Sequence, residues 1–233
     1  MIDIHCHLLY GVDDGAKTPE ISKAMLADAS AQGITDLILT PHYRQGMFPY
    51  VQDDIRSSFA ALREEAAQRK IRLYLGCEYR ADDEIVANFK SKRCHTLADG
   101  DCVLAEYSHT STYNQIRNSL ENLITAGYTP VIAHAERYDV FAGNPSLLEE
   151  CRSMGAMIQI NADSILGYDG SDVKKTCRQI LKASLADIVA SDAHDMQDRR
   201  SHMRKCCDYI ANEYGWDTAM NLFTVNPLRI LER

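Results

Sequence analysis

The chain begins Met1-Ile-Asp-Ile-His5-Cys6-His7-Leu-Leu-Tyr-Gly-Val-Asp13-Asp14-Gly15, a short apolar strand that runs into a polar, glycine-bounded loop. Successive side chains of a strand alternate between its two faces, so His5 and His7 point the same way and Cys6 points the other way. A single metal ion can accept nitrogen from two imidazoles placed like this. A buried strand with two hydrogen-bonded histidines is the commoner explanation of an isolated pair, so the rest of the chain has to decide.

Apolar strands alternate with helices beyond this stretch. Residues 18–33 predict a helix, with Thr18 as the cap, Pro19 at the first helical position and Gly33 at the end. Further strands are expected at 34–42, 71–78, 101–106, 129–134, 156–161 and 187–191. Further helices are expected at 51–70, 82–89, 113–126, 145–154, 171–184, 199–214 and 218–231, with a break at Pro227.

Seven strands, each followed by a helix, predict parallel strands in one domain that covers residues 1–233. Runs such as Leu37-Ile-Leu39 and Val131-Ile-Ala133 are apolar on both faces, as expected of strands buried in a parallel sheet or barrel. We expect a closed or nearly closed α/β barrel, with a doubly wound open sheet as the alternative.

Composition narrows the class of protein. The 233 residues are 45% hydrophobic and 25% charged, and the formal net charge of -8 disfavours nucleic acid as a partner. No apolar run reaches the ~20 residues that span a bilayer, so we expect no membrane insertion, and no signal sequence is evident, so we expect a cytoplasmic protein. The eight cysteines contain no Cys-x-x-Cys pair, which argues against a zinc ribbon and favours reduced, structural thiols.

Side chains that bind metals fall at the ends of the predicted strands. In an α/β barrel the carboxyl ends of the strands form the mouth where active sites are built, so these residues would meet there. Nine ligands are too many for one ion and suit a cluster of two or three, and imidazole with carboxylate fits Mn, Fe, Co or Zn better than calcium. The candidates are His5, His7, Asp14, His42, Glu78, Glu106, His134, Asp192 and His194.

Two arginines follow these candidates closely. Arg137 comes three residues after His134, and Arg199 comes five residues after His194. A guanidinium beside a metal cluster suits bidentate binding of a phosphate whose other oxygens contact the ions. Surface salt bridges to Glu136 or Asp198 are the alternative. The weaker candidates for the same role are Arg44, Arg80 and Arg200.

Several motifs in their order along the chain resemble a known family. They are His5-x-His7 with Asp13-Asp14-Gly15, Thr40-Pro-His42, Gly76-Cys-Glu78, Ile132-Ala-His134-x-Glu-Arg137-Tyr138 and Ala190-Ser-Asp192-Ala-His194. Together they resemble the PHP (polymerase and histidinol phosphatase) superfamily, and within it the metal-dependent protein-tyrosine phosphatases of bacterial capsular and exopolysaccharide synthesis. The resemblance implies a distorted (β/α)7 TIM-like barrel with three divalent ions, often manganese, at its carboxyl-end mouth; Mg is a further candidate.

The same resemblance implies roles for individual residues. Arg137 and Arg199 match the phosphate-contacting arginines of the family, whereas residues 106–113 depart from its usual loop. The implied substrate is a phosphotyrosine protein, the C-terminal tail of a tyrosine autokinase, hydrolysed by a hydroxide that the ions generate. The implied ion sites are His5, His7, Glu78 and Asp192 for one ion, Glu78, Glu106 and His134 for the second, and Asp14, His42 and His194 for the third.

Two other functions stay open at this point. One is a small-molecule phosphatase of histidinol-phosphate type, and the other is an inactive PHP module that binds metal and serves regulation. A cysteine-dependent phosphatase is excluded at Cys6, because the phosphate-binding Arg would come six residues later, where Val12 stands. The oligomeric state and the general acid stay open, with Asp13, His109 and Asp195 as loop candidates.

Overall fold

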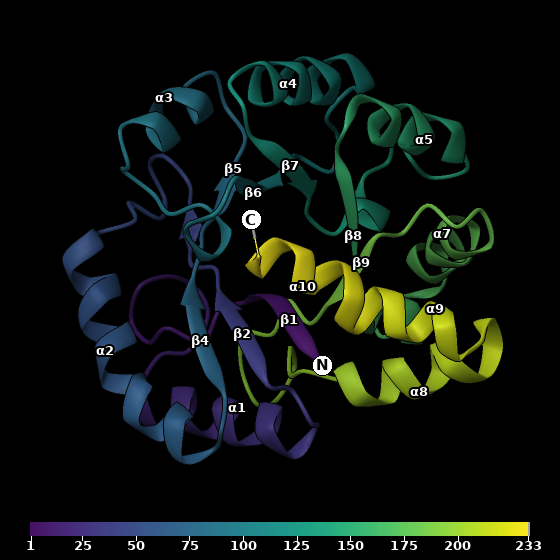
Figure 1. The fold of residues 1–233 in the computed structure, drawn as a ribbon. Coiled ribbons are helices and arrows are strands. Elements are labelled where there is room, and N and C mark those ends of the chain that lie inside the picture. The colour runs from purple at the N-terminus through teal and green to yellow at the C-terminus, as the bar shows by residue number, and fades with distance from the viewer. Residues whose placement is uncertain (233) are drawn as a thin grey trace.

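Strands and helices alternate throughout residues 1–232, the part of the chain that the computed structural model describes (Figure 1). All paired strands run parallel. The strands are β1 Ile2–Cys6, β2 Asp36–Leu39, β3 His42–Tyr43, β4 Arg72–Leu75, β5 Glu78–Arg80, β6 Cys102–Glu106, β7 Thr129–Ile132, β8 Met157–Asn161 and β9 Ile188–Ala190.

Helices connect these strands and cover the outside of the barrel (Figure 1). Two of them begin at side-chain caps: the Thr18 side chain accepts a hydrogen bond from Ile21 N–H, and Thr112 forms a capping box with Gln115. The helices are α1 Pro19–Ala31, α2 Gln52–Gln68, α3 Ile85–Lys90, α4 Tyr113–Thr125, α5 Pro145–Met154, α6 Ala162–Leu166, α7 Ser171–Lys182, α8 Met203–Tyr214, α9 Trp216–Met220 and α10 Asn226–Leu231. Short turns are η1 Leu97–Asp99, η2 Ala135–Arg137 and the π-helical η3 Asn221–Val225.

The strands form two sheets that curl into one barrel. One sheet has the order β1-β2-β4 and the other the order β3-β5-β6-β7-β8-β9. Backbone bonds join the first strand to the segment after the last: His7 N–H donates to Ala193 O at 2.8 Å, and Asp192 N–H donates to His5 O at 2.8 Å. The predicted α/β barrel is therefore confirmed, and the open-sheet alternative is wrong.

Two of the seven predicted strands are each split into two. The predicted strand 34–42 becomes β2 and β3, separated by Thr40-Pro41, where proline has no N–H to donate. The predicted strand 71–78 becomes β4 and β5, separated at Gly76, where a Cβ would lie 2.9 Å from Ile38 Cγ2. Both breaks come just before a candidate ligand, His42 or Glu78.

The helical predictions differ from the structure at the end of the chain. The helix expected from residue 199 begins at Met203. The helix expected at 218–231 is divided next to Pro227, as predicted: the π-helical turn η3 ends at Val225, and α10 begins at Asn226 with Pro227 in its first turn. The short helix α6 was not expected. No helix within residues 1–232 is long and apolar enough to cross a membrane.

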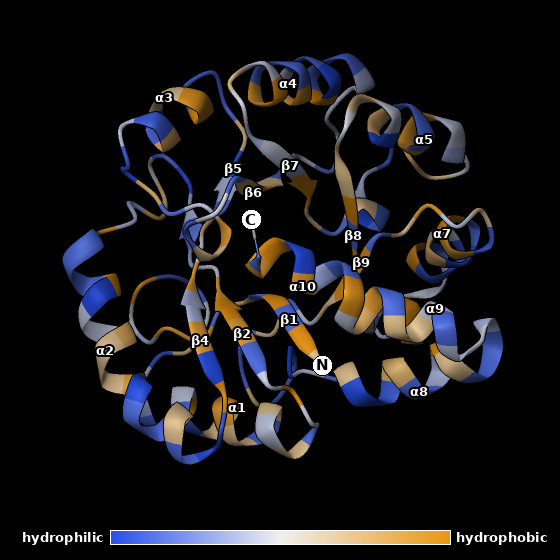
Figure 2. Ribbon diagram, viewed as in Figure 1, coloured by the Kyte–Doolittle hydropathy of each residue, from blue (hydrophilic) through white to orange (hydrophobic). Residues whose placement is uncertain are grey.

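Apolar side chains fill the barrel at the amino ends of its strands. Ile4, Ile38 and Val131 belong to one buried cluster, which Leu97 of η1 and Ile230 of α10 close at the amino end. Helix α10 lies across this end in Figure 1, and β1 and β2 beside it carry hydrophobic residues in Figure 2. The pairing of β1 with β2 shifts register between Asp3 and Cys6, so Ile4 packs in this cluster while the next residue, His5, contacts the polar mouth.

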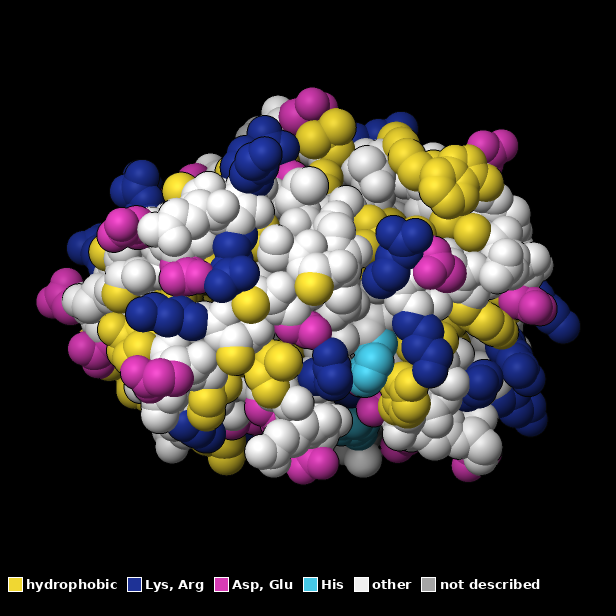
Figure 3. Space-filling view, turned by 90° about the horizontal axis from the view of Figure 1, so that it is seen from below, with side chains coloured by type: hydrophobic (Ala, Val, Ile, Leu, Met, Phe, Trp, Pro, Cys, Tyr) yellow, Lys and Arg dark blue, Asp and Glu magenta, His cyan; other side chains and the backbone are white. Residues whose placement is uncertain are grey.

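Helices pack on the barrel through one apolar face and present polar residues to solvent, as the alternating colours of α1, α4 and α7 show (Figure 2). On the face that turns α1 and α8 toward the viewer, acidic and basic side chains are interspersed with small hydrophobic patches (Figure 3).

Candidate metal centre

The strand-end residues meet at the carboxyl end of the barrel, as the sequence predicts. Six of the nine candidates have buried side chains, and Asp14, His42 and Glu106 are more accessible at the rim. Three groups of them bring nitrogen or oxygen atoms within 4.8 Å of one another. The groups are His5, His7, Glu78 and Asp192; His7, Asp14, His42 and His194; and His42, Glu78 and Glu106.

The first group is the most deeply buried. His5 Nε2 lies 3.2 Å from Glu78 Oε2 and 3.3 Å from Asp192 Oδ1. His7 Nε2 lies 3.2 Å from the same Glu78 oxygen and 3.5 Å from the same Asp192 oxygen. Two imidazole nitrogens and two carboxylate oxygens therefore surround one point, in the set that the resemblance implies for the first ion.

The second group lies closer to the rim. Asp14 Oδ1 is 3.4 Å from His42 Nε2 and 3.5 Å from His194 Nε2, and His7 joins these residues. The rings of His7 and His194 stack with centroids 3.9 Å apart. This group contains the set implied for the third ion and adds His7.

The third group differs in part from the implied set. Glu78 and Glu106 are together as expected, but the histidine grouped with them is His42, whose Nδ1 lies 3.0 Å from Glu78 Oε2. His134 Nε2 instead contacts the other oxygen of Glu78, Oε1, at 2.8 Å. Glu78 therefore touches four histidines and is the centre of the mouth.

Four of the five histidines share one orientation. Each places Nδ1 against an atom that accepts a hydrogen bond, so Nδ1 carries the ring proton and the lone pair lies on Nε2, which faces the carboxylates. The Tyr138 hydroxyl can accept because it already donates to Ala133 O at 2.8 Å. The pairs are His5 with Gln159 Oε1 at 3.1 Å, His7 with Asp13 Oδ2 at 2.8 Å, His134 with the Tyr138 hydroxyl at 3.3 Å, and His194 with Asp192 O at 2.8 Å.

Several buried polar atoms in this cluster have no hydrogen-bond partner. A lone pair that faces a carboxylate oxygen is repelled by it, unless a proton or a metal ion lies between the two. A buried lone pair without a partner costs free energy. These imidazole nitrogens and carboxylate oxygens therefore fit the binding of divalent cations. These atoms are His42 Nδ1, Glu78 Oε2, Glu106 Oε2 and His194 Nε2.

The pKa shifts follow from the same geometry. Burial alone would raise the pKa of the Glu78 carboxyl, but the charges of His5 and His42 outweigh it and hold this pKa well below its usual value. Burial alone would lower the pKa of His5, whereas Glu78 and Asp192 raise it. Burial and the neighbouring His7 lower the pKa of His194 to about 4. A cation that binds beside His5 therefore competes with a strongly held proton.

Two candidate ligands have a strained backbone. His134 has φ of 33° and Asp192 has φ of 53°, in the left-handed region that non-glycine residues rarely adopt. Such strain costs about 1–3 kcal/mol and persists where surrounding contacts hold the residue in place. His134 is held by its N–H bond to Gln159 Oε1 at 2.9 Å, and Asp192 by its N–H bond to His5 O at 2.8 Å.

Both predicted arginines reach the cluster. Arg137 Nη1 lies 2.9 Å from Asp192 Oδ2, and its Nη2 lies 3.1 Å from Asp169 Oδ2. Arg199 Nη2 lies 3.3 Å from the same Asp192 oxygen, and its Nη1 lies 3.6 Å from Asp14 Oδ2. The expected alternatives, Glu136 and Asp198, are not the partners in these ion pairs. Two guanidinium groups therefore converge on one edge of the mouth.

Two of the weaker arginine candidates, Arg80 and Arg200, lie in different places. Arg80 lies at the mouth, where its Nη1 is 3.2 Å from Glu106 Oε1. Arg200 points away from the mouth and pairs with Asp28 on α1 at 2.7 Å, so it does not compete with Arg199.

The three loop candidates for a general acid all have positioning contacts. Asp13 accepts from His7 Nδ1, from His42 N–H and from Gly15 N–H, and these contacts lower its pKa although burial alone would raise it. His109 Nδ1 donates to Arg137 O at 2.9 Å. Asp195 accepts from Arg199 N–H at 3.0 Å. Each of them therefore supports a residue of the mouth.

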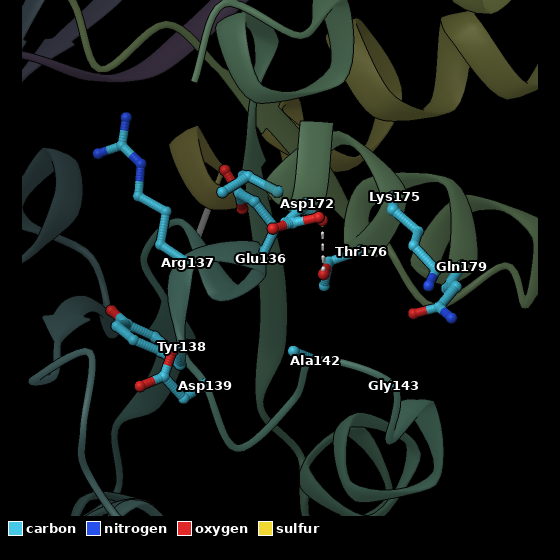
Figure 4. A pocket seen from close by; sticks show the side chains of 11 residues that line it. Glu136, Arg137, Tyr138, Asp139, Ala142, Gly143, Asp172, Lys175, Thr176 and Gln179 are labelled. Atoms are coloured by element: carbon cyan, nitrogen blue, oxygen red, sulfur yellow. Dashed lines mark hydrogen bonds between the residues drawn. The ribbon is translucent and has the colours of Figure 1, made fainter. Parts of the chain in front are cut away.

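A cavity of about 430 Å³ lies behind Arg137, between η2 and α7. Figure 4 shows Asp172, Lys175, Thr176 and Gln179 of α7 along one wall, whereas the Arg137 side chain points away from them. The Arg137 guanidinium contacts Asp192 on the other side, so this cavity is separate from the metal centre.

Sequence reasoning missed four polar residues around the centre. Gln159 and Asn161 of β8 are fully buried, and Tyr138 and Asp169 contact His134 and Arg137. A signal was present in β8, where Gln159 and Asn161 interrupt an otherwise apolar strand at alternate positions. Seven of the eight cysteines are buried, and Cys6 packs in the outer core as its strand position predicts.

A parallel barrel with imidazoles, carboxylates and two arginines at its mouth defines a class of metal-dependent hydrolases built on α/β barrels. Residues 1–232 match the family model "Capsular polysaccharide synthesis, CpsB/CapC". The chain therefore belongs to the CpsB/CapC family, which confirms the resemblance seen in the sequence.

Individual relatives agree with this assignment. The tyrosine-protein phosphatase CpsB of Streptococcus pneumoniae is 37% identical over 99% of this chain and 98% of its own length. The tyrosine-protein phosphatase YwqE of Bacillus subtilis is 32% identical over 92% of this chain and 85% of its own length. A crystal structure from work on YwqE and CpsB, described as unique metal-dependent tyrosine phosphatases, superposes with a TM-score of 0.92 at 31% identity and covers 100% of this chain and 94% of that one.

More distant structures share the fold alone. A lactonase of Listeria monocytogenes has a TM-score of 0.66 at 10% identity, covering 99% of this chain and 94% of that one. The predicted fold class and the predicted metal-dependent phosphatase class thus agree with the similar proteins found.

Proposed function

We propose that this chain is a metal-dependent protein-tyrosine phosphatase that hydrolyses phosphotyrosine. One observation carries the proposal: imidazole Nε2 atoms converge on the oxygens of Glu78 and Asp192, beside the guanidinium groups of Arg137 and Arg199. The relatives with this activity match nearly the whole chain. An inactive regulatory module would not need this complete set of ligands and phosphate-binding cations.

The three groups of ligands support a cluster of three divalent ions. Each pair of groups shares one residue, which is His7, His42 or Glu78, so the ions would lie close together, and Glu78 would bridge two of them. Manganese is the proposed metal, and Fe, Co, Zn and Mg are alternatives with similar ligand preferences. When bound, the ions supply a water of lowered pKa as nucleophile and neutralise charge on the phosphate.

Arg137 and Arg199 bind and orient the phosphate. Both guanidinium groups contact Asp192 Oδ2, so a phosphate at this edge would lie between the two cations and the ligand groups. Arg137 is held firmly, because Asp169 and Asp192 fix its two terminal nitrogens and its side chain is 21% exposed. Arg199 is 42% exposed, which suits contact with an incoming substrate. Preformed positive charge here stabilises the transition state of phosphoryl transfer.

No dedicated general acid is required of this site. The Asp13 carboxylate is fixed by three hydrogen bonds and stays ionised, and His109 is occupied with Arg137 O. A phenolate is a fairly good leaving group, so tyrosine departs without strong proton donation. No covalent phospho-enzyme is needed, and Cys6 is not a nucleophile, because burial raises the pKa of its thiol, which contacts Ile38 O at 3.6 Å.

The proposed substrate is a phosphotyrosine in a flexible protein tail, that of a bacterial tyrosine autokinase controlling capsular or exopolysaccharide synthesis, in the cytoplasm. Rim residues Asp14 and His42 are accessible, so an extended peptide can approach the cluster. A small-molecule phosphatase such as histidinol-phosphate phosphatase is the second candidate, since the phosphate chemistry is the same.

Turnover of a phosphotyrosine peptide and of histidinol phosphate, measured with equal Mn²⁺, tests this choice. We expect the phosphotyrosine peptide to be strongly preferred in kcat/KM. A preference for histidinol phosphate would overturn the proposed substrate while leaving the metal chemistry intact. An absence of turnover on both, in protein that has bound Mn²⁺, would support the inactive module instead.

A further inference from the structure

Strand β8 supplies none of the nine candidate ligands, yet its polar side chains lie in the metal centre. Gln159 and Asn161 are both 0% exposed. Gln159 Oε1 accepts from His134 N–H at 2.9 Å and contacts His5 Nδ1 at 3.1 Å. Gln159 Nε2 lies 2.7 Å from Asn161 Oδ1, and Asn161 Nδ2 lies 2.9 Å from Asp192 Oδ2. Two amides thus connect candidate ligands from three other segments.

The directions of the hydrogen bonds that Gln159 and Asn161 make follow from one backbone group. The N–H of His134 can only donate, so the atom of Gln159 that faces it is the carbonyl oxygen. The Gln159 amide nitrogen must then donate to Asn161 Oδ1. The Asn161 amide nitrogen in turn donates to the Asp192 carboxylate.

These directions determine which nitrogen of His5 carries the proton when the ring is neutral. Because Gln159 Oε1 can only accept, His5 Nδ1 carries a proton, and the neutral ring presents its lone pair at Nε2. Nε2 is the atom that faces Glu78 Oε2 and Asp192 Oδ1. An imidazole fixed in this tautomer is ready to bind a cation there.

Asp192 is oriented from the other end of the chain. Asn161 and Arg137 both bind its Oδ2, at 2.9 Å each. Oδ1 is therefore left to face His5 and His7, at 3.3 and 3.5 Å. One oxygen of the carboxylate is held by the protein and the other is presented to the metal position.

We propose that Gln159 and Asn161 form an amide relay that positions the first metal site by fixing the His5 tautomer and the free oxygen of Asp192. The inference rests on the proposed metal-dependent function and extends it to residues that touch no ion. A purely structural role explains the pair less well, because it would not require the two amides to end on His5 and Asp192, two members of the same ligand group. The relay also anchors the strained backbone of His134.

Gln159→Met and Asn161→Leu test the relay, because each keeps approximate volume and removes the amide. Asn88→Leu is the matched control: Asn88 is buried, and its amide donates to the Tyr79 hydroxyl at 2.6 Å, away from the ligands. Each variant is stripped of metal, and three quantities are measured: its thermal unfolding with chelator, its Mn²⁺ affinity and stoichiometry by calorimetry, and its visible spectrum with Co²⁺.

We expect Gln159→Met and Asn161→Leu to weaken the tightest Mn²⁺ site about 10- to 100-fold and to change the Co²⁺ spectrum, whereas Asn88→Leu lowers only the unfolding temperature. Wild-type Mn²⁺ affinity in both relay variants would overturn the inference, and so would an equal loss of affinity in Asn88→Leu. A wild-type chain that binds no Mn²⁺ would overturn the proposed function as well. Normal Mn²⁺ binding without phosphatase turnover would refute the activity but leave the relay supported.

Discussion

The two ends of the barrel are built from the same strands with opposite kinds of side chain. At the amino end Ile4, Val131 and Ile188 pack into an apolar cluster that α10 and η1 cover. At the carboxyl end the same strands finish in histidines, carboxylates and amides, with buried atoms that lack hydrogen-bond partners. A few residues of chain separate the two environments.

This difference shows how the molecule divides stability from chemistry. The apolar end gains free energy from burial and needs no ion, whereas the polar end buries charges that destabilise one another until cations bind. At the polar end the backbone of His134 and of Asp192 is held in the left-handed region. Substitutions at the two ends should therefore separate cleanly into losses of function and losses of stability.

Glu78→Ala should have the largest effect, because Glu78 contacts four histidines and bridges two ligand groups. We expect bound metal to fall by at least one ion per chain and turnover to fall by about 10³-fold or more. Elemental analysis and peptide dephosphorylation measure both quantities. Glu149→Ala on the exposed face of α5 is the control, and similar losses there would contradict a special role of Glu78.

Arg137→Ala should separate metal binding from phosphate chemistry. Its guanidinium belongs to no ligand group, and Asn161 still holds Asp192 Oδ2 when Arg137 is removed, so we expect full metal content and a loss of about 10²–10³-fold in kcat/KM. Arg200→Ala, which breaks only the contact to Asp28, should retain normal turnover. If the Arg137 variant hydrolyses substrate normally, its assigned role is wrong.

Ile188→Ala tests the apolar end. Ile188 is 0% exposed within the apolar cluster at the amino end, so its truncation to alanine should lower the free energy of unfolding by about 2–5 kcal/mol. Metal affinity and kcat, measured well below the unfolding temperature, should stay close to wild type. A specific loss of metal at unchanged stability would break the division between the two ends.

Metal affinity should depend on pH in a definite direction. Burial alone would lower the pKa of His5 and of His7, but Glu78 and Asp192 raise the pKa of His5, and Asp13 raises that of His7. Protons therefore compete with the ion up to a higher pH than for a free imidazole. Affinity for Mn²⁺ should fall about tenfold per pH unit for each displaced proton as pH drops below these raised values. Calorimetric titrations with Mn²⁺ at several pH values measure this dependence, and an affinity that does not change with pH would contradict the competition.

The stability of the metal-free chain should depend on pH in the opposite direction. The protonated histidines stabilise the fold at low pH, and this contribution is lost as pH rises through the raised pKa.

Cys6→Ser should have the smallest effect on catalysis. The Cys6 thiol faces the outer core, and burial raises its pKa well above the usual value, so it is no nucleophile. Turnover and metal content should stay within about twofold of wild type, with a modest loss of stability from the buried hydroxyl. Abolished turnover in a variant with normal metal content would contradict the mechanism.

The sequence predicted the mouth of the barrel well because of a topological rule. Carboxyl ends of parallel strands meet, so His5, His42 and Asp192 could be placed together although they lie far apart in the chain. Ligand side chains also have distinctive chemistry. Both features are visible without coordinates.

The remaining features depend on packing that the chain pattern does not contain. Gln159 and Asn161 look like ordinary polar residues until their distances to His5 and Asp192 are known. The grouping of His42, rather than His134, with Glu106 is also not visible in the sequence, where the two strands that the structure splits before His42 and Glu78 look continuous. The π-helical turn before Pro227 likewise follows from tertiary contacts with β1 and β9.

One measurement tests the central claim most directly: phosphate release from a phosphotyrosine peptide by the chelated chain and by the same sample after Mn²⁺ is restored, with bound metal counted in each. The account predicts no turnover without metal, and full recovery as binding approaches three ions per chain. Turnover that persists after complete removal of metal, or a fully loaded chain that leaves the peptide phosphorylated, would contradict it.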